Sequence, residues 1–162
     1  MKITTGMVTG VAAGMLLAAV TAQANLITGE IDMSGTVSLN GNSLATATSA
    51  TFYAGTVTYD SGAYSRVNVG TPVNWASVLS WNPKNTPVTL WTFQSKLLTY
   101  TFTVGSVNVV SQSSSRLALS GTGVATITGL GSPFQKSLAT WSLSIFRDPS
   151  SDTGYRFTFD DP

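Results

Sequence analysis

Apolar and polar residues alternate along most of the chain, and this period of two predicts β-strands rather than helices. The clearest example is residues 98–104. Leu98, Tyr100, Phe102 and Val104 fall on one face of such a strand, and three threonines fall on the other. We therefore expect these four apolar side chains to be buried together in the core.

The same pattern predicts further strands at residues 27–39, 44–53, 56–59, 63–69, 88–93, 107–112, 116–120, 124–128, 138–146 and 155–159. Asn40 and Gly41 predict a two-residue hairpin turn, because both residue types tolerate a positive φ. Residues 70–87 are rich in proline and predict a long loop, with one helical turn at 75–79. Many short strands separated by turns indicate a single all-β domain over residues 25–162, an antiparallel β-sandwich or a jelly-roll-like fold.

The first 24 residues have the three-part layout of a secretory signal peptide. Lys2 is positively charged, residues 7–20 are mostly apolar, and Ala22 and Ala24 form a small-residue cleavage site. The apolar run is shorter than the roughly 20 residues that a membrane-spanning helix needs. We expect cleavage after Ala24 and a mature chain without a membrane span, secreted to the extracellular space or the cell surface. A retained N-terminal anchor and a periplasmic location are the alternatives.

The charged residues of the mature chain cancel. The full sequence holds 8 basic and 7 acidic residues, and Lys2 leaves with the signal peptide. Nucleic acids and anionic lipids are bound largely through basic residues, so this balance predicts neither as a partner. Serine and threonine supply an uncharged polar surface instead. Such a surface suits contact with exopolysaccharide or self-association with other copies of the chain.

The chain contains no histidine and no cysteine. It therefore lacks the commonest general base and the commonest zinc ligands. The serines at 113–115 cannot form a Ser-His-Asp triad, and no motif supports a dyad with Lys84, Lys96 or Lys136. The aspartates lie beside predicted turns or at the end of the chain, and we interpret them as turn-forming and solvating residues. We predict a protein that is not an enzyme, with no catalytic residue and no cofactor.

Two groups of residues are candidates for binding. Trp75, Trp81 and Trp91 lie in or beside the proline-rich stretch, and exposed indole rings stack on sugar faces. The alternative is that these rings cover the core. The loop at 148–154 offers oxygen ligands of the kind that calcium prefers, but it lacks the spacing of a calcium-binding loop. We interpret it as an ordinary hairpin loop and predict no metal site.

Several segments resemble exported bacterial proteins of the PEP-CTERM type, namely residues 27–40, 45–48, 117–129, 141–144 and 155–159. The resemblance implies a secreted β protein sorted to the cell surface, often in bacteria that make exopolysaccharide. The sequence given departs from the family at its end, where Asp160, Asp161 and Pro162 stand in place of the sorting tail. The leading hypothesis is a non-enzymatic protein of the bacterial surface or extracellular matrix. A carbohydrate-binding module is the alternative, and a secreted hydrolase is the third.

Overall fold

The computed structural model describes residues 24–76, 78–148 and, for the backbone, 155–161. Nearly all of this is β-structure, with one short 3₁₀ turn, η1, at Gly62–Tyr64. The strands are β1 Asn25–Leu26, β2 Ile31–Leu39, β3 Ser49–Asp60, β4 Pro72–Trp75, β5 Leu79–Ser80, β6 Val88–Ser95, β7 Leu98–Val104, β8 Asn108–Gln112, β9 Arg116–Gly129, β10 Phe134–Gln135, β11 Ser137–Arg147 and β12 Tyr155–Asp161. The predicted all-β fold class is confirmed.

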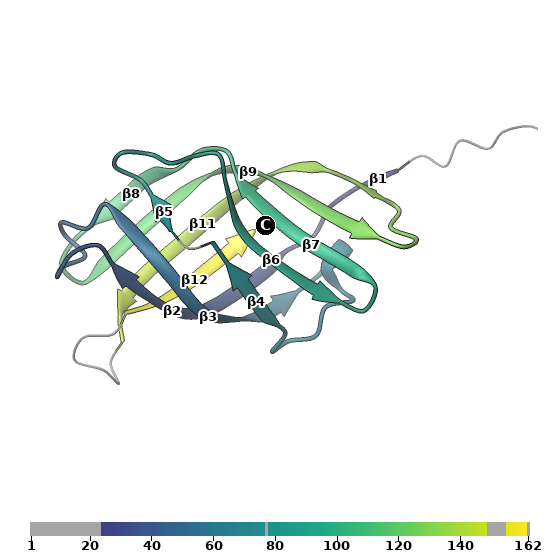
Figure 1. Ribbon diagram of the computed structural model, residues 1–162, viewed down its shortest axis with the longest axis horizontal. Coiled ribbons are helices and arrows are strands. Elements are labelled where there is room, and N and C mark those ends of the chain that lie inside the picture. Colours follow the sequence, from purple (N-terminus) through teal and green to yellow (C-terminus); the bar gives the residue numbers. More distant parts are fainter. Residues whose placement is uncertain (1–23, 77, 149–154, 162) are drawn as a thin grey trace, which may run out of the picture.

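One antiparallel sheet makes up almost the whole domain and curls until it closes (Figure 1). Its strands follow the order β11-β12-β2-β3-β4-β6-β7-β9-β8, and β9 pairs with β11 as well. The short β5 pairs with β3, and β1 pairs with β10 in a separate parallel pair. The two layers expected of a sandwich are therefore opposite walls of a single curled sheet.

Strand β9 closes the sheet because it is long enough to pair with three neighbouring strands. It pairs with β11 over residues 116–125, with β8 over 117–120 and with β7 over 123–129. The sequence predicted two strands here with a break around Gly121 and Gly123. Instead, the strand is continuous, and both glycines make room for close packing. A Cβ atom on Gly121 would overlap the Ser106 carbonyl, and one on Gly123 would overlap the ring of Phe102.

The interior of the curled sheet is filled by apolar side chains that alternate along each strand. Leu98, Tyr100, Phe102 and Val104 are all buried, as the alternation predicted. Aromatic rings form contacts through the centre of this core. Their centroids are separated by 5.7 Å for Trp91 and Phe102, 5.0 Å for Phe93 and Tyr100, and 6.0 Å for Tyr64 and Tyr100. Ring pairs at these separations stabilise the core beyond the burial of their area.

The predicted hairpin turn at Asn40 and Gly41 is wrong. The connection from β2 to β3 is a longer loop over residues 40–48. The Asn40 side chain joins the two ends of this loop, because its Oδ1 accepts hydrogen bonds from the backbone N–H groups of Thr48 and Ser49 at 2.9 and 3.1 Å. Leu44 is fully buried. Burying this side chain requires more chain than a two-residue turn provides.

Two other predictions for the middle of the chain are corrected. Residues 63–69 do not form a strand: they begin in η1 and continue through turns. The N–H of Ala63 donates to the Thr28 carbonyl at 2.7 Å, and this local arrangement directs Tyr64 into the core. The proline-rich stretch contains β4 and β5, where a loop with a helical turn was expected.

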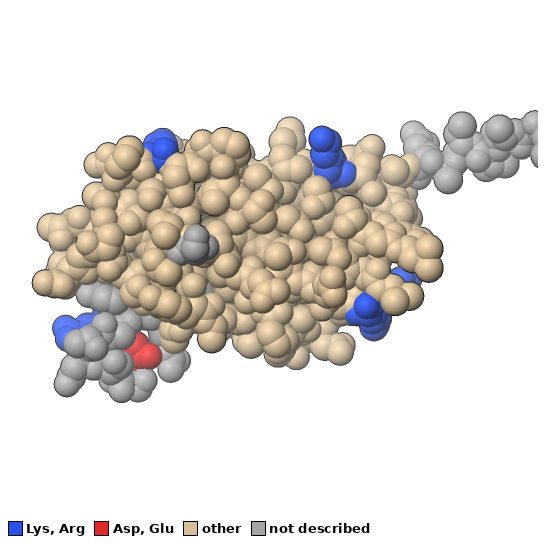
Figure 2. Space-filling model, viewed as in Figure 1, with Lys and Arg blue, Asp and Glu red and all other residues tan. Residues whose placement is uncertain are grey.

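Few charged side chains are visible across the face shown in Figure 2. Within the described part of the chain, no helical segment has the length and hydrophobicity needed to cross a bilayer. The predicted signal peptide, residues 1–24, lies almost wholly outside the described residues.

Candidate functional site

The clearest recess lies where β12 stops short of covering the edge of β11. β12 pairs with β11 only from Arg147 to Ser142, so residues 137–141 of β11 extend past this pairing. Residues 27–29, which connect β1 to β2, pass on the other side of the gap. The result is a half-open pocket of about 290 Å³ in the wall of the curled sheet.

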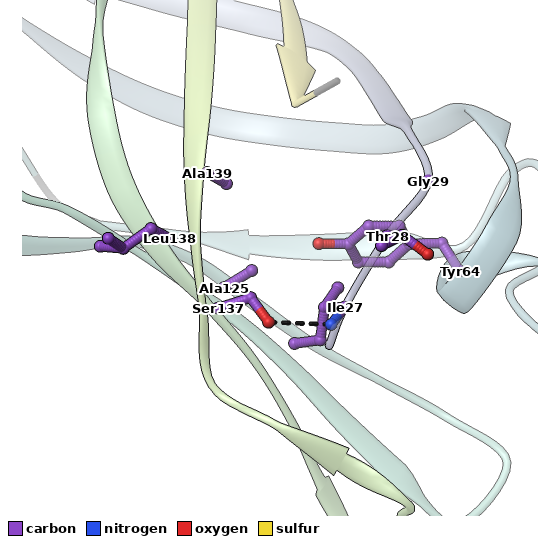
Figure 3. Close-up of a pocket in the computed structure, with 8 residues that line it drawn as sticks. All are labelled: Ile27, Thr28, Gly29, Tyr64, Ala125, Ser137, Leu138 and Ala139. Atoms are coloured by element: carbon purple, nitrogen blue, oxygen red, sulfur yellow. Dashed lines mark hydrogen bonds between the residues drawn. The ribbon is translucent and has the colours of Figure 1, made fainter. Parts of the chain in front are cut away.

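Four parts of the chain line this pocket (Figure 3). Ile27, Thr28 and Gly29 come from the connection before β2, and Tyr64 comes from η1. The remaining lining residues are Ala125 on β9 and Ser137, Leu138 and Ala139 on β11. The ring of Tyr64 lies between the two walls, with its hydroxyl group pointing into the space (Figure 3). The pocket is therefore mostly apolar, with a small number of hydroxyl groups.

Hydrogen bonds fix the two walls relative to each other. The Ser137 hydroxyl accepts the backbone N–H of Ile27 at 2.8 Å and donates to the Gln135 carbonyl at 3.2 Å. Ser137 is only 7% exposed, so these bonds satisfy a polar group inside the wall. The bond from Ala63 to the Thr28 carbonyl holds η1, and with it Tyr64, against the same connection.

Behind Tyr64 lies Tyr100, whose side chain is fully buried. Burial raises the pKa of the Tyr100 hydroxyl, while the charge of Arg66 lowers it and that of Asp60 raises it further. Tyr100 is therefore neutral at physiological pH. The polar side chains of the pocket lining itself are the hydroxyls of Thr28, Tyr64 and Ser137. This chemistry suits a small neutral group better than an ion or a reacting carbonyl.

A second, more open hollow adjoins the pocket. It measures about 420 Å³ and is lined by Thr122, Leu138, Ala139 and Thr140. Leu138 and Ala139 belong to both hollows, and Leu138 is 87% exposed. The start of β11 is thus an uneven apolar and hydroxyl-bearing surface rather than a deep cleft.

The structure does not assemble the three predicted tryptophans into an exposed platform. Trp91 is fully buried and Trp81 is 4% exposed, with its indole N–H donating to the Ala47 carbonyl at 3.0 Å. Trp75 is half-buried and stacks on Phe52 with 5.2 Å between centroids. Trp81 and Trp91 are therefore part of the core, which is the alternative stated for these rings from the sequence. An irregularity in the β6–β7 pairing at Leu90 places both Leu90 and Trp91 in the core.

The remaining candidates have structural roles or lie elsewhere. The Ser113 hydroxyl accepts the N–H of Arg116 at 3.1 Å and shapes the turn before β9. Lys84 donates to Asn108, and Lys96 occupies the turn between β6 and β7. Among the residues described, no three His, Cys, Asp or Glu side chains gather as metal ligands. The suggested calcium loop falls mostly at 149–154, outside the described residues.

Sequence reasoning missed the pocket because its residues carry no motif. Tyr64 lies in a segment that was predicted to be a strand, and Ser137 is one serine among many. Comparison with known proteins adds no relative, since no protein-family model, curated protein or solved structure matches the chain. The resemblance to PEP-CTERM-type proteins therefore stays a prediction.

Proposed function

We propose that this protein is an exported, non-enzymatic β domain that acts at the bacterial cell surface or in the extracellular matrix through uncharged contacts. The observation that carries the proposal is the outer face of β6, β7 and β9, which is a layer of threonines. Thr92, Thr101 and Thr126 lie side by side across the three strands. The Oγ1 atoms of Thr92 and Thr101 are 3.1 Å apart. Such a face offers hydrogen bonds without long-range electrostatic attraction.

The position of the first described strand is compatible with export. The signal peptide is expected to end at Ala24, and β1 begins at the next residue, Asn25. The Asn25 backbone nitrogen donates to the Pro133 carbonyl at 2.7 Å. Cleavage would convert this nitrogen to an ammonium group, which still donates hydrogen bonds. Processing at this bond is therefore compatible with the described fold.

A second candidate, binding of a neutral glycan, is favoured by two exposed tyrosines rather than by the tryptophans. Tyr53 and Tyr59 on β3 are 56% and 48% exposed. The Tyr53 hydroxyl lies 3.1 Å from the Ser38 hydroxyl on β2. Aromatic rings flanked by hydroxyl groups are suited to stacking on the apolar face of a sugar. In this proposal, Tyr53 and Tyr59 replace the three tryptophans as the rings that contact the glycan.

The test has two parts. Intact-mass measurement of protein recovered outside the cytoplasm should show a chain that starts at Asn25. A product that keeps Met1 and stays in the cytoplasm would contradict the proposed export. The exported protein is then mixed with exopolysaccharide from the producing cells at low salt and at tenfold higher salt. We expect retention at both, because the contacts are uncharged.

The double variant Tyr53→Ala/Tyr59→Ala decides between the two candidates. Loss of retention in this variant, with an unchanged melting temperature, identifies a glycan-binding module. Unchanged retention favours a matrix protein that associates through its hydroxyl-rich faces. Release of reducing ends from the polysaccharide by the wild-type protein would contradict the non-enzymatic proposal.

A further inference from the structure

Three exposed leucines gather at one end of the molecule. Leu26 in β1 is 59% exposed, Leu97 in the β6–β7 turn is 73% exposed, and Leu130 just after β9 is 85% exposed. β1 and the β6–β7 turn lie at the same end of the long axis (Figure 1). Exposed apolar side chains that cluster in this way indicate an interaction surface more strongly than isolated ones do.

The backbone holds these leucines close together. Leu98 pairs with Gly129, which places Leu97 beside Leu130. The approach is so close that a Cβ atom on Gly129 would overlap the Leu97 carbonyl oxygen. Leu26 joins the group through β1, because it pairs with Gln135 and the preceding N–H binds the Pro133 carbonyl.

The residue types at these positions are unusual for turns. Ser95 pairs with Leu98, so Lys96 and Leu97 form a two-residue hairpin turn. Such turns favour Asn and Gly, which adopt a positive φ at little cost. Here Lys96 has a φ of 56° and the next residue is an exposed leucine. These two residues depart from the usual turn preference and gain no burial in return, so we expect a functional reason for them.

Three exposed cations surround the leucines. Lys96 precedes Leu97, and the Arg66 carbonyl accepts a hydrogen bond from Ser95 at 3.3 Å, next to the same turn. Lys136 follows Gln135, the partner of Leu26. Figure 2 shows blue side chains at this end, and the red side chain visible in this view lies at the opposite end. Glu30 and Asp60 lie beside Ser61 near Arg66, so the three cations leave this end with a small net positive charge.

We propose that this end of the protein docks on an anionic phospholipid surface. The end patch is defined by Leu26, Leu97, Leu130, Arg66, Lys96 and Lys136. The leucines enter the headgroup boundary, and the cations bind lipid phosphates. The whole-chain charge argued against such docking, but docking depends on the local arrangement. The mature N-terminus at Asn25, whose new ammonium group adds a positive charge, lies at this same end, a point that rests on the proposed export.

Vesicle flotation tests the proposal, with the exported protein and phosphatidylcholine vesicles that contain or lack phosphatidylglycerol. We expect the wild-type protein to float with the anionic vesicles and to be released by salt. Leu97→Ser/Leu130→Ser should lower the partition coefficient roughly tenfold or more. Each of Lys96→Gln and Lys136→Gln should lower it about fivefold, on anionic vesicles only.

A matched control comes from the opposite end, where Lys84 contacts Asn108 and Val110 is 65% exposed. Lys84→Gln/Val110→Ser makes the same kinds of change there and should leave flotation unchanged. The proposal is overturned if the wild-type protein does not float, or if the control variant loses as much binding as the end-patch variants. It is also overturned if light scattering shows a dimer that Leu97→Ser/Leu130→Ser dissociates, because the patch would then bind a second copy.

The flotation test and the export test can fail separately, because the intact mass of the recovered protein reports on export alone. If the mass shows that the leader is retained, the same variants are compared in the full chain, where the leader is identical in each.

Discussion

Gly55 in β3 provides the sharpest test of the described core. A Cβ atom at this position would overlap the indole nitrogen of Trp75. The next contacts, to Trp75 Cε2 at 3.2 Å and to the Ser34 carbonyl oxygen at 3.3 Å, are tight but can be relieved by small shifts. Gly55 does not have a positive φ, so its backbone accommodates alanine. Gly55→Ala therefore creates one severe overlap, with the half-buried ring of Trp75, and a milder contact with the Ser34 carbonyl oxygen.

Two effects of opposite sign decide the outcome. Alanine at a compatible position stabilises a fold by about 0.4–1 kcal/mol, because it restricts the unfolded chain. Forcing a packed ring to move costs about 1–3 kcal/mol. We expect Gly55→Ala to lower the free energy of unfolding by about 1–2 kcal/mol in the wild-type background. Trp75→Phe removes the indole nitrogen, so adding Gly55→Ala to that variant should be neutral or stabilising.

Urea titration followed by far-ultraviolet circular dichroism measures all four members of this cycle. The coupling free energy between the two sites should be about 1–3 kcal/mol. Gly41 supplies the control, since nothing lies within 4 Å of a Cβ placed there, and Gly41→Ala should gain a few tenths of a kcal/mol. Additive effects at Gly55 and Trp75, or an unaltered Gly55→Ala protein, would refute the described position of the Trp75 ring.

Four further outcomes are expected. Phe102→Ala should lower the free energy of unfolding by about 3–5 kcal/mol in the same titration, because the ring is fully buried against Trp91; a loss of a few tenths would contradict this packing. Tyr100→Phe removes a buried hydroxyl that has no hydrogen-bond partner among the described residues, and should be neutral or stabilising by about 1 kcal/mol at neutral pH. Because the pKa of Tyr100 is raised above 10.0 in the folded state, the wild-type protein should lose stability as pH rises above 10.0, and a melting curve of Tyr100→Phe should show a smaller loss; equal losses would exclude Tyr100 as the cause. A chelator should leave the melting temperature nearly unchanged, whereas a shift of about 10 °C or more would reveal a metal that the proposed function does not include.

The alternation of side chains was enough to predict the strands that lie fully against the core. β7 is the best example, because each of its apolar residues faces inward and each threonine faces outward. β11 was found within two residues of its observed ends for the same reason, and β6 was found equally closely although Leu90 and Trp91 interrupt its alternation. Period-two burial is a local property of an extended chain, so the sequence carries it without knowledge of any partner strand.

The local sequence led to wrong predictions for residues whose role depends on a neighbour that is distant in the chain. Gly121 and Gly123 look like turn residues, yet they lie within β9 and make room for Ser106 and Phe102. Asn40 and Gly41 have the composition of a tight hairpin, but the connection is a longer loop because Leu44 is buried in the core. In each case a tertiary contact outweighed the local preference.

The candidate site belongs almost entirely to the tertiary structure. The sequence determined that the surface would be rich in hydroxyl groups and poor in charge. Only the closure of the sheet, with β12 pairing along just part of β11, created the pocket beside Ser137 and Tyr64. Only the register of β7 against β9 brought Leu97 next to Leu130. Composition and alternation are properties of single segments, whereas pockets and patches depend on which segments become neighbours, and long-range strand pairing decides that.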